Sequence, residues 1–439
     1  MLSREDNELL TRTGPDAPMG QLLRRYWIPA LISDELPRPD CTPVKVKLLG
    51  EELLAFRNTN GDVGLVDEFC PHRKVSLYFG RNEECGIRCV YHGWKFDVSG
   101  QCVDMPSEPP ESSFKEKVKI KSYPCRERGG VVWTYMGPPE LMPELPELEW
   151  ALVPDSHRYT SRRIQECNYF QAIEGGLDSS HISFLHRNAG GQGFMGTKAF
   201  DKSQAPSYLT QDTAPKFEIE KVDYGMMVGA KRNADPGNLY WRITQFVMPF
   251  YTMIPPFEHS PRGAHAWVPM DDEHVYTWNI NWNPLRALTD EERDILKQGR
   301  GIHMELIPGT LRTVQNKDND YLIDREAQAS GKSFTGIKGI GAQDSAVQET
   351  QGAIADRSVE RLGTSDAAII AARRIMLNAV KNLQQGIAPP AIDAKSHNVR
   401  SASLILPEGV AFQIGAKEKL VTQPGDFIDV ESTEQSDVV

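Results

Sequence analysis

Two short motifs that each pair a cysteine with a histidine constrain this chain more than any other feature. One residue separates Cys70 from His72, two separate Cys89 from His92, and the sixteen residues 73–88 lie between the pairs. Zinc sites with two cysteines and two histidines usually group like residues together. Pairs that mix a thiolate with an imidazole suit a [2Fe–2S] cluster in which one iron takes both cysteines and the other both histidines. The sequence therefore predicts such a cluster rather than a zinc finger.

The segments around these motifs have the pattern of short antiparallel strands. Apolar residues alternate from Val44, and Asn60-Gly61 and Ser99-Gly100 are hairpin signals between strand-like runs. Each motif follows a strand directly, so both would lie on loops at strand ends and hold one cluster between them. We expect a small antiparallel β domain over roughly residues 40–140, followed by a proline-rich linker.

Composition limits the classes of partner. The 439 residues suffice for a second domain of ordinary size. A net charge of −11 argues against nucleic acid and anionic membranes, and no apolar run approaches the ~20 residues of a membrane span. The N-terminus lacks the apolar segment of a secretory signal, so we expect a cytoplasmic protein. Cysteines outside the motifs are then expected to be reduced thiols: Cys41, Cys85, Cys102, Cys125 and Cys167.

A second set of candidate metal ligands follows the linker. Glu174, Asp178 and His181 fall on one face of a helix, and His186 comes five residues after His181. An ideal helix would place the two imidazoles roughly 140° apart, so the helix must end, widen or bend between them to serve one metal. Two imidazoles and a carboxylate form the facial triad of non-haem Fe(II) oxygenases, although such histidines can equally be core or surface residues. Spacing does not choose the carboxylate among Asp318, Asp320, Asp324, Asp344 and Asp356.

Cys-Pro-His-Arg at 70–73, followed by Cys-x-Tyr-His-Gly-Trp at 89–94, resembles the Rieske oxygenases, the terminal components of bacterial aromatic-ring dioxygenases. The opening residues 1–14 are similar to the phthalate dioxygenase group of this family. The resemblance covers nearly the whole chain, to about the helix that ends near Gly386. It implies two cofactors, a Rieske [2Fe–2S] cluster and a mononuclear Fe(II).

The resemblance also implies an α+β fold in three parts. An N-terminal segment and antiparallel β Rieske domain are expected over residues 1–145. An α+β catalytic domain of the helix-grip (START-like) kind, with an antiparallel sheet and helices, is expected over 146–390. A C-terminal extension, partly disordered, would occupy 391–439.

Roles for single residues follow from the same resemblance. Asp344 fits the aspartate that completes the triad with His181 and His186, because a Gln and a Glu follow it on a presumed helix; Asp356 is the second choice. Asn168 would lie near the iron.

Asp178 would bridge the two metal centres rather than bind either metal. It would hydrogen-bond His181 on one side and His92 of a neighbouring subunit on the other, because the cluster and the iron of one chain are too far apart in the family. The assembly would be a homotrimer or a stacked pair of trimers.

The implied activity is cis-dihydroxylation of an aromatic carboxylate by O₂, with phthalate attacked at ring carbons 4 and 5. The chain has no G-x-G-x-x-G motif after a strand, so electrons would come from a separate NADH-dependent flavin and iron–sulfur reductase. Isophthalate, terephthalate, chlorobenzoates and phenoxybenzoates are alternative substrates, and monooxygenation with O-demethylation is an alternative outcome. A Rieske electron carrier is the alternative from another class, and the long second half of the chain argues against it.

An aromatic carboxylate needs a cationic partner, which arginine supplies best through its two-pronged guanidinium. Arg232 and Arg242 are the candidates. Alternation along a predicted strand puts Tyr240, Arg242 and Thr244 on one face, which either lines the cavity or faces solvent.

Overall fold

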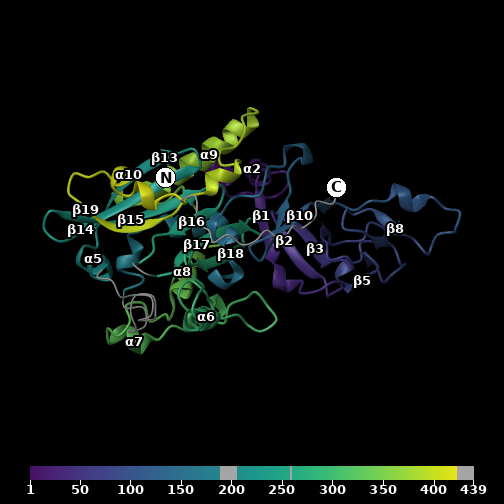
Figure 1. Ribbon diagram of the computed structural model, residues 1–439, viewed down its shortest axis with the longest axis horizontal. Coiled ribbons are helices and arrows are strands. Elements are labelled where there is room, and N and C mark those ends of the chain that lie inside the picture. Colours follow the sequence, from purple (N-terminus) through teal and green to yellow (C-terminus); the bar gives the residue numbers. More distant parts are fainter. Residues whose placement is uncertain (188–204, 258–259, 423–439) are drawn as a thin grey trace.

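The computed structural model describes residues 1–187, 205–257 and 260–422 (Figure 1). The acidic tail at 429–439, expected to be disordered, lies outside these ranges. A small β unit forms one end of the molecule and a larger α+β unit forms the other. The two-part α+β architecture predicted from the sequence is therefore confirmed.

Two four-stranded antiparallel sheets form the small unit. The first has the order β2 (Val44–Leu48), β3 (Glu51–Arg57), β4 (Val63–Asp67), β9 (Ser122–Tyr123). The second has the order β5 (Arg81–Glu83), β6 (Gly86–Arg88), β7 (Lys95–Phe96), β8 (Cys102–Asp104). Buried side chains of both sheets share one apolar cluster, which includes Phe56, Val66 and Phe96. The two hairpins predicted from their glycine turns are present, because β3 pairs with β4 and β7 with β8.

A three-stranded sheet lies between the two units (Figure 1). Its order is β1 (Trp27–Ile32), β11 (Val131–Tyr135), β10 (Cys125–Arg128). The sequence did not predict β1, because Pro29 indicated a break. In the structure β1 is an edge strand whose register shifts beside Pro29, a position that tolerates the missing N–H.

An eight-stranded antiparallel sheet forms the centre of the larger unit. Its main path has the order β12 (Arg158–Gln165), β18 (Val275–Trp282), β17 (Arg262–Pro269), β16 (Tyr251–Ile254), β15 (Asn238–Val247), β14 (Gly225–Asn233), β13 (Lys216–Val222). The last strand, β19 (Ala402–Pro407), also pairs with β15. Residues up to 422 therefore pack as part of this unit, and the separate extension expected from 391 begins too early.

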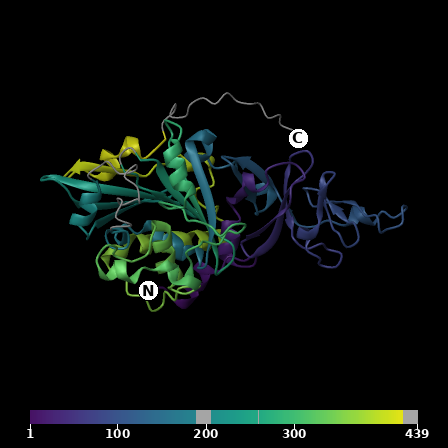
Figure 2. The same ribbon diagram turned by 90° about the horizontal axis from the view of Figure 1, so that it is seen from below.

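Helical segments lie along one face of this sheet (Figure 2). Three helices matter for the site: α4 (Tyr169–Leu177), α8 (Ile340–Glu349) and α9 (Ala367–Gln384). The predicted apolar stripe of α9 is buried at Ala372, Met376 and Val380, and Gly386 follows with φ 82°. The other helices are α1 (Arg4–Thr11), α2 (Pro18–Leu23), α3 (Glu149–Leu152), α5 (Ala205–Gln211), α6 (Asp290–Lys297), α7 (Arg325–Ala329) and α10 (Phe412–Gly415).

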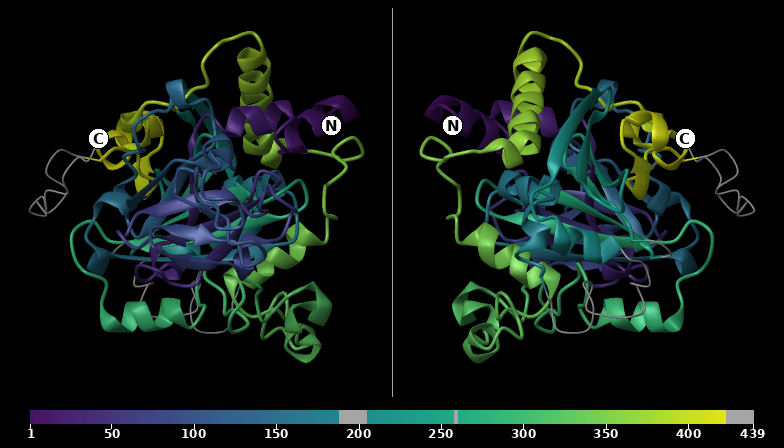
Figure 3. Two further views of the ribbon diagram at one scale, coloured as in Figure 1. Left: turned by 90° about the vertical axis from the view of Figure 1, so that its right-hand side faces the viewer. Right: turned by 90° about the vertical axis from the view of Figure 1, so that its left-hand side faces the viewer.

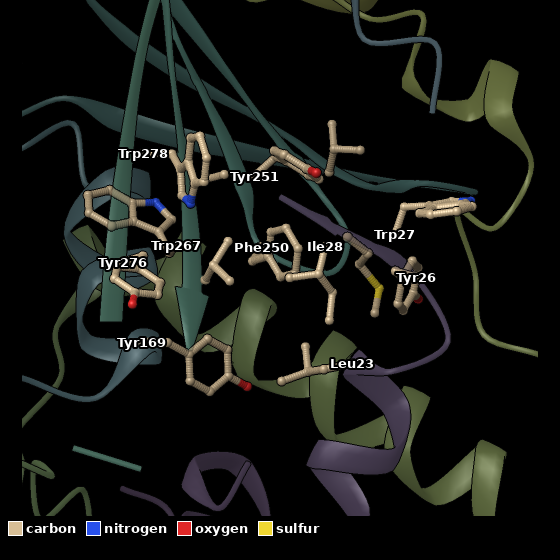
Figure 4. Packing of buried hydrophobic residues seen from close by; sticks show 14 of the residues in the cluster. Leu23, Tyr26, Trp27, Ile28, Tyr169, Phe250, Tyr251, Trp267, Tyr276 and Trp278 are labelled. Atoms are coloured by element: carbon tan, nitrogen blue, oxygen red, sulfur yellow. The ribbon is translucent and has the colours of Figure 1, made fainter. Parts of the chain in front are cut away.

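One continuous core joins the N-terminal segment to the large sheet. Figure 3 shows α9 beside the N-terminal helices, and both α1 and α2 pack against it. Figure 4 shows Leu23 and Tyr26 near Tyr169 of α4 and the aromatic side chains of the sheet, all in one buried cluster. By packing, then, the first residues of the chain belong with the larger unit rather than with the β domain that follows them.

Candidate metal centres and substrate site

Two turns of the same form carry the Cys–His motifs. The amide N–H of each cysteine donates to the carbonyl five residues on, at 2.9 Å for Cys70 and 2.8 Å for Cys89. The carbonyl of each accepts from the amide four residues on, at 2.9 Å and 3.0 Å. That fourth residue is left-handed in both turns, with φ 57° at Lys74 and 77° at Gly93. The motifs are thus two copies of one local structure that face each other at the tip of the β unit.

The cysteines are buried beneath the histidines. Cys70 and Cys89 are 2% and 3% exposed, and burial raises the pKa of the Cys70 thiol to about 11. Such a thiol stays protonated at neutral pH unless a metal binds it. The ring centroids of His72 and His92 lie 4.5 Å apart, and His72 stacks on Trp94 at 4.4 Å. Two buried sulfurs and two converging imidazoles at the surface fit the donor set of a Rieske cluster.

Charged side chains brace the second turn and join it to the first. The Arg88 guanidinium donates to the carbonyl of Gly93 at 2.8 Å and to the Asp104 carboxylate at 2.7 Å. Arg73 of the first turn donates to the hydroxyl of Tyr91 in the second at 3.0 Å. The two turns are therefore held against each other by protein contacts alone.

Helix α4 ends before the second set of ligands, because Asp178 is its C-cap and His181–Ser183 form a separate 3₁₀ turn. Two consecutive glycines near the end of α4 allow neighbouring elements to approach the helix closely on two sides. A Cβ at Gly175 would lie 2.2 Å from Nε2 of Gln348 in α8, and one at Gly176 would lie 2.6 Å from Oγ1 of Thr252 in β16. These glycines place the turn after α4 between the sheet and α8.

Three candidate ligands meet there. Nε2 of His186 lies 3.1 Å from Nε2 of His181 and 3.2 Å from Oδ1 of Asp344, and His181 Nε2 lies 3.7 Å from the same oxygen. Burial alone would raise the pKa of Asp344, but His186 and His181 lower it below its usual value. Two imidazole nitrogens and one carboxylate oxygen within 4.8 Å of one another fit the facial triad of non-haem iron.

The presumed helix that carries Asp344 is present, because α8 starts at Ile340 and presents Asp344 from its second turn. The alternative ligand Asp356 lies elsewhere, where its carboxylate accepts from the backbone N–H of Ser358 at 3.0 Å and from the Ser358 hydroxyl at 2.5 Å. Among the described residues, Asp344 is the aspartate that lies beside both histidines.

A second residue orients each histidine. Nδ1 of His181 lies 3.4 Å from Oδ2 of Asp178, and Nδ1 of His186 lies 2.8 Å from Oε1 of Gln343. An acceptor at Nδ1 favours the tautomer whose Nε2 lone pair is free for the metal. Asp178 was expected in this position, whereas Gln343 was not singled out from the sequence. It precedes Asp344 by one residue, and only the fold of the turn around His186 brings the ring to it.

Glu174 was expected on the face of α4 that carries the ligands, and this expectation is wrong. Its carboxylate accepts from Arg357 at 2.9 Å and 3.0 Å and from Arg373 of α9 at 2.7 Å. All three side chains are buried. The helical period holds only to Leu177, so Glu174 fastens α4 to α9 while the next turns point to the metal site.

Asn168 also has a different place from the one expected. It is the N-cap of α4, where its Oδ1 accepts from Phe170 N–H at 3.1 Å. Its Nδ2 donates to the carbonyls of Thr11 and Asp272 at 2.9 Å and 2.7 Å. Every polar atom of the side chain is thus engaged in fixing the start of the helix, and we assign Asn168 a structural role rather than one at the iron.

The two arginines proposed for the substrate differ sharply. Arg232 donates to the carbonyl of Ser179 at 2.6 Å and to its hydroxyl at 3.3 Å, and it also donates to the carbonyl of Asp212. It supports the backbone between Asp178 and His181, so the expectation that it binds substrate is not supported by its contacts.

Arg242 has free donors instead. It is 3% exposed, and its Nε and Nη1 have no hydrogen-bond partner among the residues that the structure describes. The guanidinium lies over the ring of Phe257 at 5.2 Å. The pKa of His181 is raised: burial lowers it, Asp178 and Asp344 raise it by more, and the charge of Arg242 lowers it in part. A buried cation with open donors thus lies within electrostatic range of the metal site.

A crevice of about 1520 Å³ opens between β19 and α6. Its lining includes Tyr240 and Phe257 but none of the three candidate iron ligands. Phe257 therefore both lines the crevice and lies under the guanidinium of Arg242. Among the described residues, no helix is long and apolar enough to cross a membrane.

Comparison with known proteins agrees with both centres. Residues 26–124 match the family model of the Rieske [2Fe–2S] domain, and residues 134–418 match the model described as LigXa C-terminal domain like. The chain belongs to the Rieske-type aromatic-ring-hydroxylating oxygenases, as an oxygenase component of the phthalate dioxygenase group. Proteins of this class carry a Rieske cluster and a mononuclear iron, and they receive electrons from a separate redox partner.

Two relatives and one solved structure illustrate the likeness. The oxygenase subunit of phthalate 4,5-dioxygenase from Pseudomonas putida is 44% identical over 396 residues, 88% of each chain. The oxygenase subunit of 3-chlorobenzoate-3,4-dioxygenase from Comamonas testosteroni is 38% identical over 436 residues, 96% of this chain and 99% of the relative. The oxygenase in the ferredoxin complex of carbazole 1,9a-dioxygenase shares the fold, with a TM-score of 0.54 at 20% identity over 84% of this chain and 93% of that one.

Proposed function

We propose that this terminal oxygenase cis-dihydroxylates an aromatic carboxylate, with phthalate attacked at ring carbons 4 and 5. The observation that carries the substrate class is Arg242, a buried guanidinium near the metal site, whose Nε and Nη1 have no hydrogen-bond partner in the described part of the chain. A buried cation without an anionic partner is unfavourable, and a substrate carboxylate supplies that partner. The 44% identity to a phthalate 4,5-dioxygenase subunit supports phthalate within this class.

We assign the ligands of the cluster as follows. Cys70 and Cys89 would hold one iron, and His72 and His92 would hold the other. The matched turns, the buried thiols and the converging imidazoles support this assignment.

We assign the mononuclear iron to His181, His186 and Asp344. The convergence of their donor atoms within 4.8 Å supports this assignment. His181, His186 and Asp344 would hold an iron from one side and leave positions free, and the bound iron would supply the activation of O₂ there.

The side chains around this iron have separate tasks. Arg242 would bind and orient the carboxylate, so that the far edge of the ring faces the metal. Asp178 and Gln343 hold the protons on the Nδ1 atoms of the two histidines. Phe257 covers the guanidinium and helps to exclude water from the ion pair.

We further propose that electrons pass between subunits of a homotrimer or stacked hexamer, supplied from NADH by a separate reductase. The two candidate metal sites lie in different units of one chain. Asp178, with a side chain 24% exposed, is available to bridge His181 to His92 of a neighbouring subunit. Mixing a Cys89→Ala chain with a His186→Ala chain should then restore part of the activity, since some interfaces join an intact cluster to an intact iron. Co-assembly without any recovery would place the transfer within one chain.

A screen of aromatic acids with a reductase tests the reaction. We expect oxygen uptake and a dihydrodiol product with phthalate. If only another acid causes oxygen uptake, that acid replaces phthalate as the proposed substrate. Release of formaldehyde from methoxylated acids, without a diol, would indicate O-demethylation. Iron analysis separates an oxygenase, with a cluster and a mononuclear iron, from an electron carrier with the cluster alone. Loss of cluster EPR in Cys89→Ala checks the cluster ligands independently.

A further inference from the structure

A row of polar side chains crosses the sheet beneath the iron site. Cross-strand pairing aligns Thr252 of β16 with His265 of β17, His265 with Asn279 of β18, and Asn279 with Ser161 of β12. Phe246 of β15 pairs with Thr252, so alternation puts Arg242 on the same face, four residues along β15. This face is also the one that α4 meets at Gly176.

The two ends of the row have their hydrogen bonds satisfied within the protein. Thr252 Oγ1 accepts from the indole N–H of Trp267 at 2.9 Å. Ser161 Oγ lies 2.6 Å from Nδ1 of His303. These contacts account for the outer members of the row.

The two middle members of the row, His265 and Asn279, differ from the outer ones in their hydrogen bonding. Nδ1 of His265 and both amide atoms of Asn279 are buried and have no hydrogen-bond partner within residues 1–187, 205–257 and 260–422. Asn279 is fully buried and His265 is 8% exposed. The two side chains are close enough that Asn279, together with the backbone of Trp278, raises the pKa of His265, but no contact of these three atoms with the described residues meets hydrogen-bond geometry. Leaving three such atoms unpaired costs ~1–3 kcal/mol for each group, so a bound molecule is expected to pair with them.

The pair lies close to the iron ligands and carries no charge. His265 and Asp344 are within electrostatic range, because each affects the pKa of the other. Burial lowers the pKa of His265 to about 4, so its imidazole is neutral at physiological pH. Trp267 fixes the ring with its centroid 4.5 Å away. Close to the metal there is thus a neutral polar pair, distinct from the cationic Arg242.

We propose that His265 and Asn279 form a second substrate subsite, which hydrogen-bonds an oxygen-bearing substituent on the aromatic ring while Arg242 binds the carboxylate. This inference rests on the proposed function, since it assumes an aromatic acid in the site. The amide of Asn279 can donate and accept, and the neutral imidazole adds one further polar atom. The pair therefore recognises a hydroxyl, an ether or a second carboxyl oxygen by hydrogen bonding.

Matched pairs of acids test this subsite by binding rather than turnover. Equilibrium dialysis under anaerobic conditions measures Kd of the holoenzyme for phthalate against 2-methylbenzoate. It also measures isophthalate, 3-hydroxybenzoate and 3-methoxybenzoate against 3-methylbenzoate. At one ring position at least, the oxygen-bearing acid should bind about fivefold more tightly than its methyl analogue, the factor of one buried neutral hydrogen bond. A difference in Kd for phthalate or isophthalate would indicate that the subsite binds a carboxylate, and a difference for 3-hydroxybenzoate or 3-methoxybenzoate would indicate that it binds a neutral oxygen substituent.

Three variants locate the effect. In Asn279→Ala and His265→Ala, the ratio of the Kd of the methyl analogue to the Kd of the oxygen-bearing acid should fall towards one. The Kd of the methyl analogue itself should change less than about threefold. Asn281→Ala is the control: it lies two residues along the same face, but Asn281 already bonds His303 at 3.0 Å and the carbonyl of Arg262 at 3.0 Å. The control should keep the wild-type ratio. Cluster absorbance and Tm show that each variant is folded, and Asn279→Ser replaces any Asn279→Ala protein that is not.

The possible failures are distinguishable. If wild-type protein binds none of the acids, the proposed function fails and the subsite with it. If the acids bind and Arg242→Met abolishes binding, but the ratio survives in both the His265 and the Asn279 variants, only the subsite is overturned. An equal fall in Asn281→Ala also overturns it, because the effect would then be structural.

Discussion

Replacement of Gln343 by alanine should weaken iron binding without changing any ligand. Gln343 is fully buried, and its Oε1 accepts from Nδ1 of His186 at 2.8 Å. Its Nε2 donates to Thr335 Oγ1 at 3.1 Å and to the carbonyl of Ile337 at 2.9 Å, so the amide cannot turn without breaking three contacts. The side chain is thus fixed with its acceptor towards the imidazole.

The size of the effect follows from these contacts. Loss of one buried hydrogen bond removes about 1 kcal/mol of net stabilisation, and the freed ring can also rotate or change tautomer. Removal of such an orienting partner typically lowers metal affinity by about 10- to 100-fold. We therefore expect a loss of about 1.4 to 2.8 kcal/mol in iron binding.

Chelator competition under anaerobic conditions measures this affinity, with cluster absorbance as the internal measure of protein. Ser345→Ala is the matched control, because Ser345 flanks Asp344 on the other side, is similarly buried, and its hydroxyl donates to the carbonyl of Gly341 at 2.8 Å and contacts Sδ of Met304 at 3.8 Å rather than a ligand histidine. Gln343→Glu keeps an acceptor opposite Nδ1 and should recover part of the affinity. If Gln343→Ala binds iron within about twofold of wild type, the orienting role is refuted.

Three further predictions concern stability and electron transfer. Glu174→Gln leaves two buried arginines short of a counter-charge and should lower the free energy of unfolding, measured in urea, by about 3–5 kcal/mol. Glu360→Gln is the control, because the Glu360 carboxylate is partly exposed, and it should lower the same free energy by less than about 1 kcal/mol. Equal losses in the two variants would contradict this prediction. Asp178→Asn should keep both metals but slow single-turnover oxidation of the reduced cluster by orders of magnitude, and an unchanged rate would remove its bridging role. Burial raises the pKa of Asp271, but His274 and Lys47 lower it well below 3.8, while Asp271 raises the pKa of His274 above 6.5. The Asp271 contribution to stability is lost as pH falls through its lowered pKa, and that of His274 as pH rises through its raised one, so Asp271→Asn should flatten Tm against pH at both limits.

Most of the candidate metal ligands could be proposed from the sequence because their chemistry lies in contiguous motifs. A Cys–His pair on a turn indicates metal binding without knowledge of the rest of the fold, and so do two histidines that follow a helix. Asp344 lies far along the chain, and only the family resemblance selected it before the structure placed it beside His186.

The misplaced residues share a physical cause. Asn168 precedes a helix, and asparagine is a preferred N-cap residue, so a structural interpretation was available beside the functional one. Its observed contacts are those of an N-cap. Glu174 was placed by extending one helical period past the point where Asp178 ends the helix. Gln343, His265 and Asn279 carry no local signal, because their partners come from distant strands and turns.

The path of the chain through the three-stranded sheet has a mechanical consequence. The backbone leaves this sheet after β1, builds both small sheets with the Cys–His turns at their tip, and returns to it at β10. The cluster-bearing arm is therefore tethered at two strands of one sheet, β1 and β10, which flank β11, and Lys47 adds a third contact, to Asp271 at 2.7 Å. An arm anchored in this way cannot swivel about a single linker towards its own iron. In the proposed assembly, any change in the distance between cluster and iron would then come from how neighbouring copies are docked rather than from hinge motion within one copy.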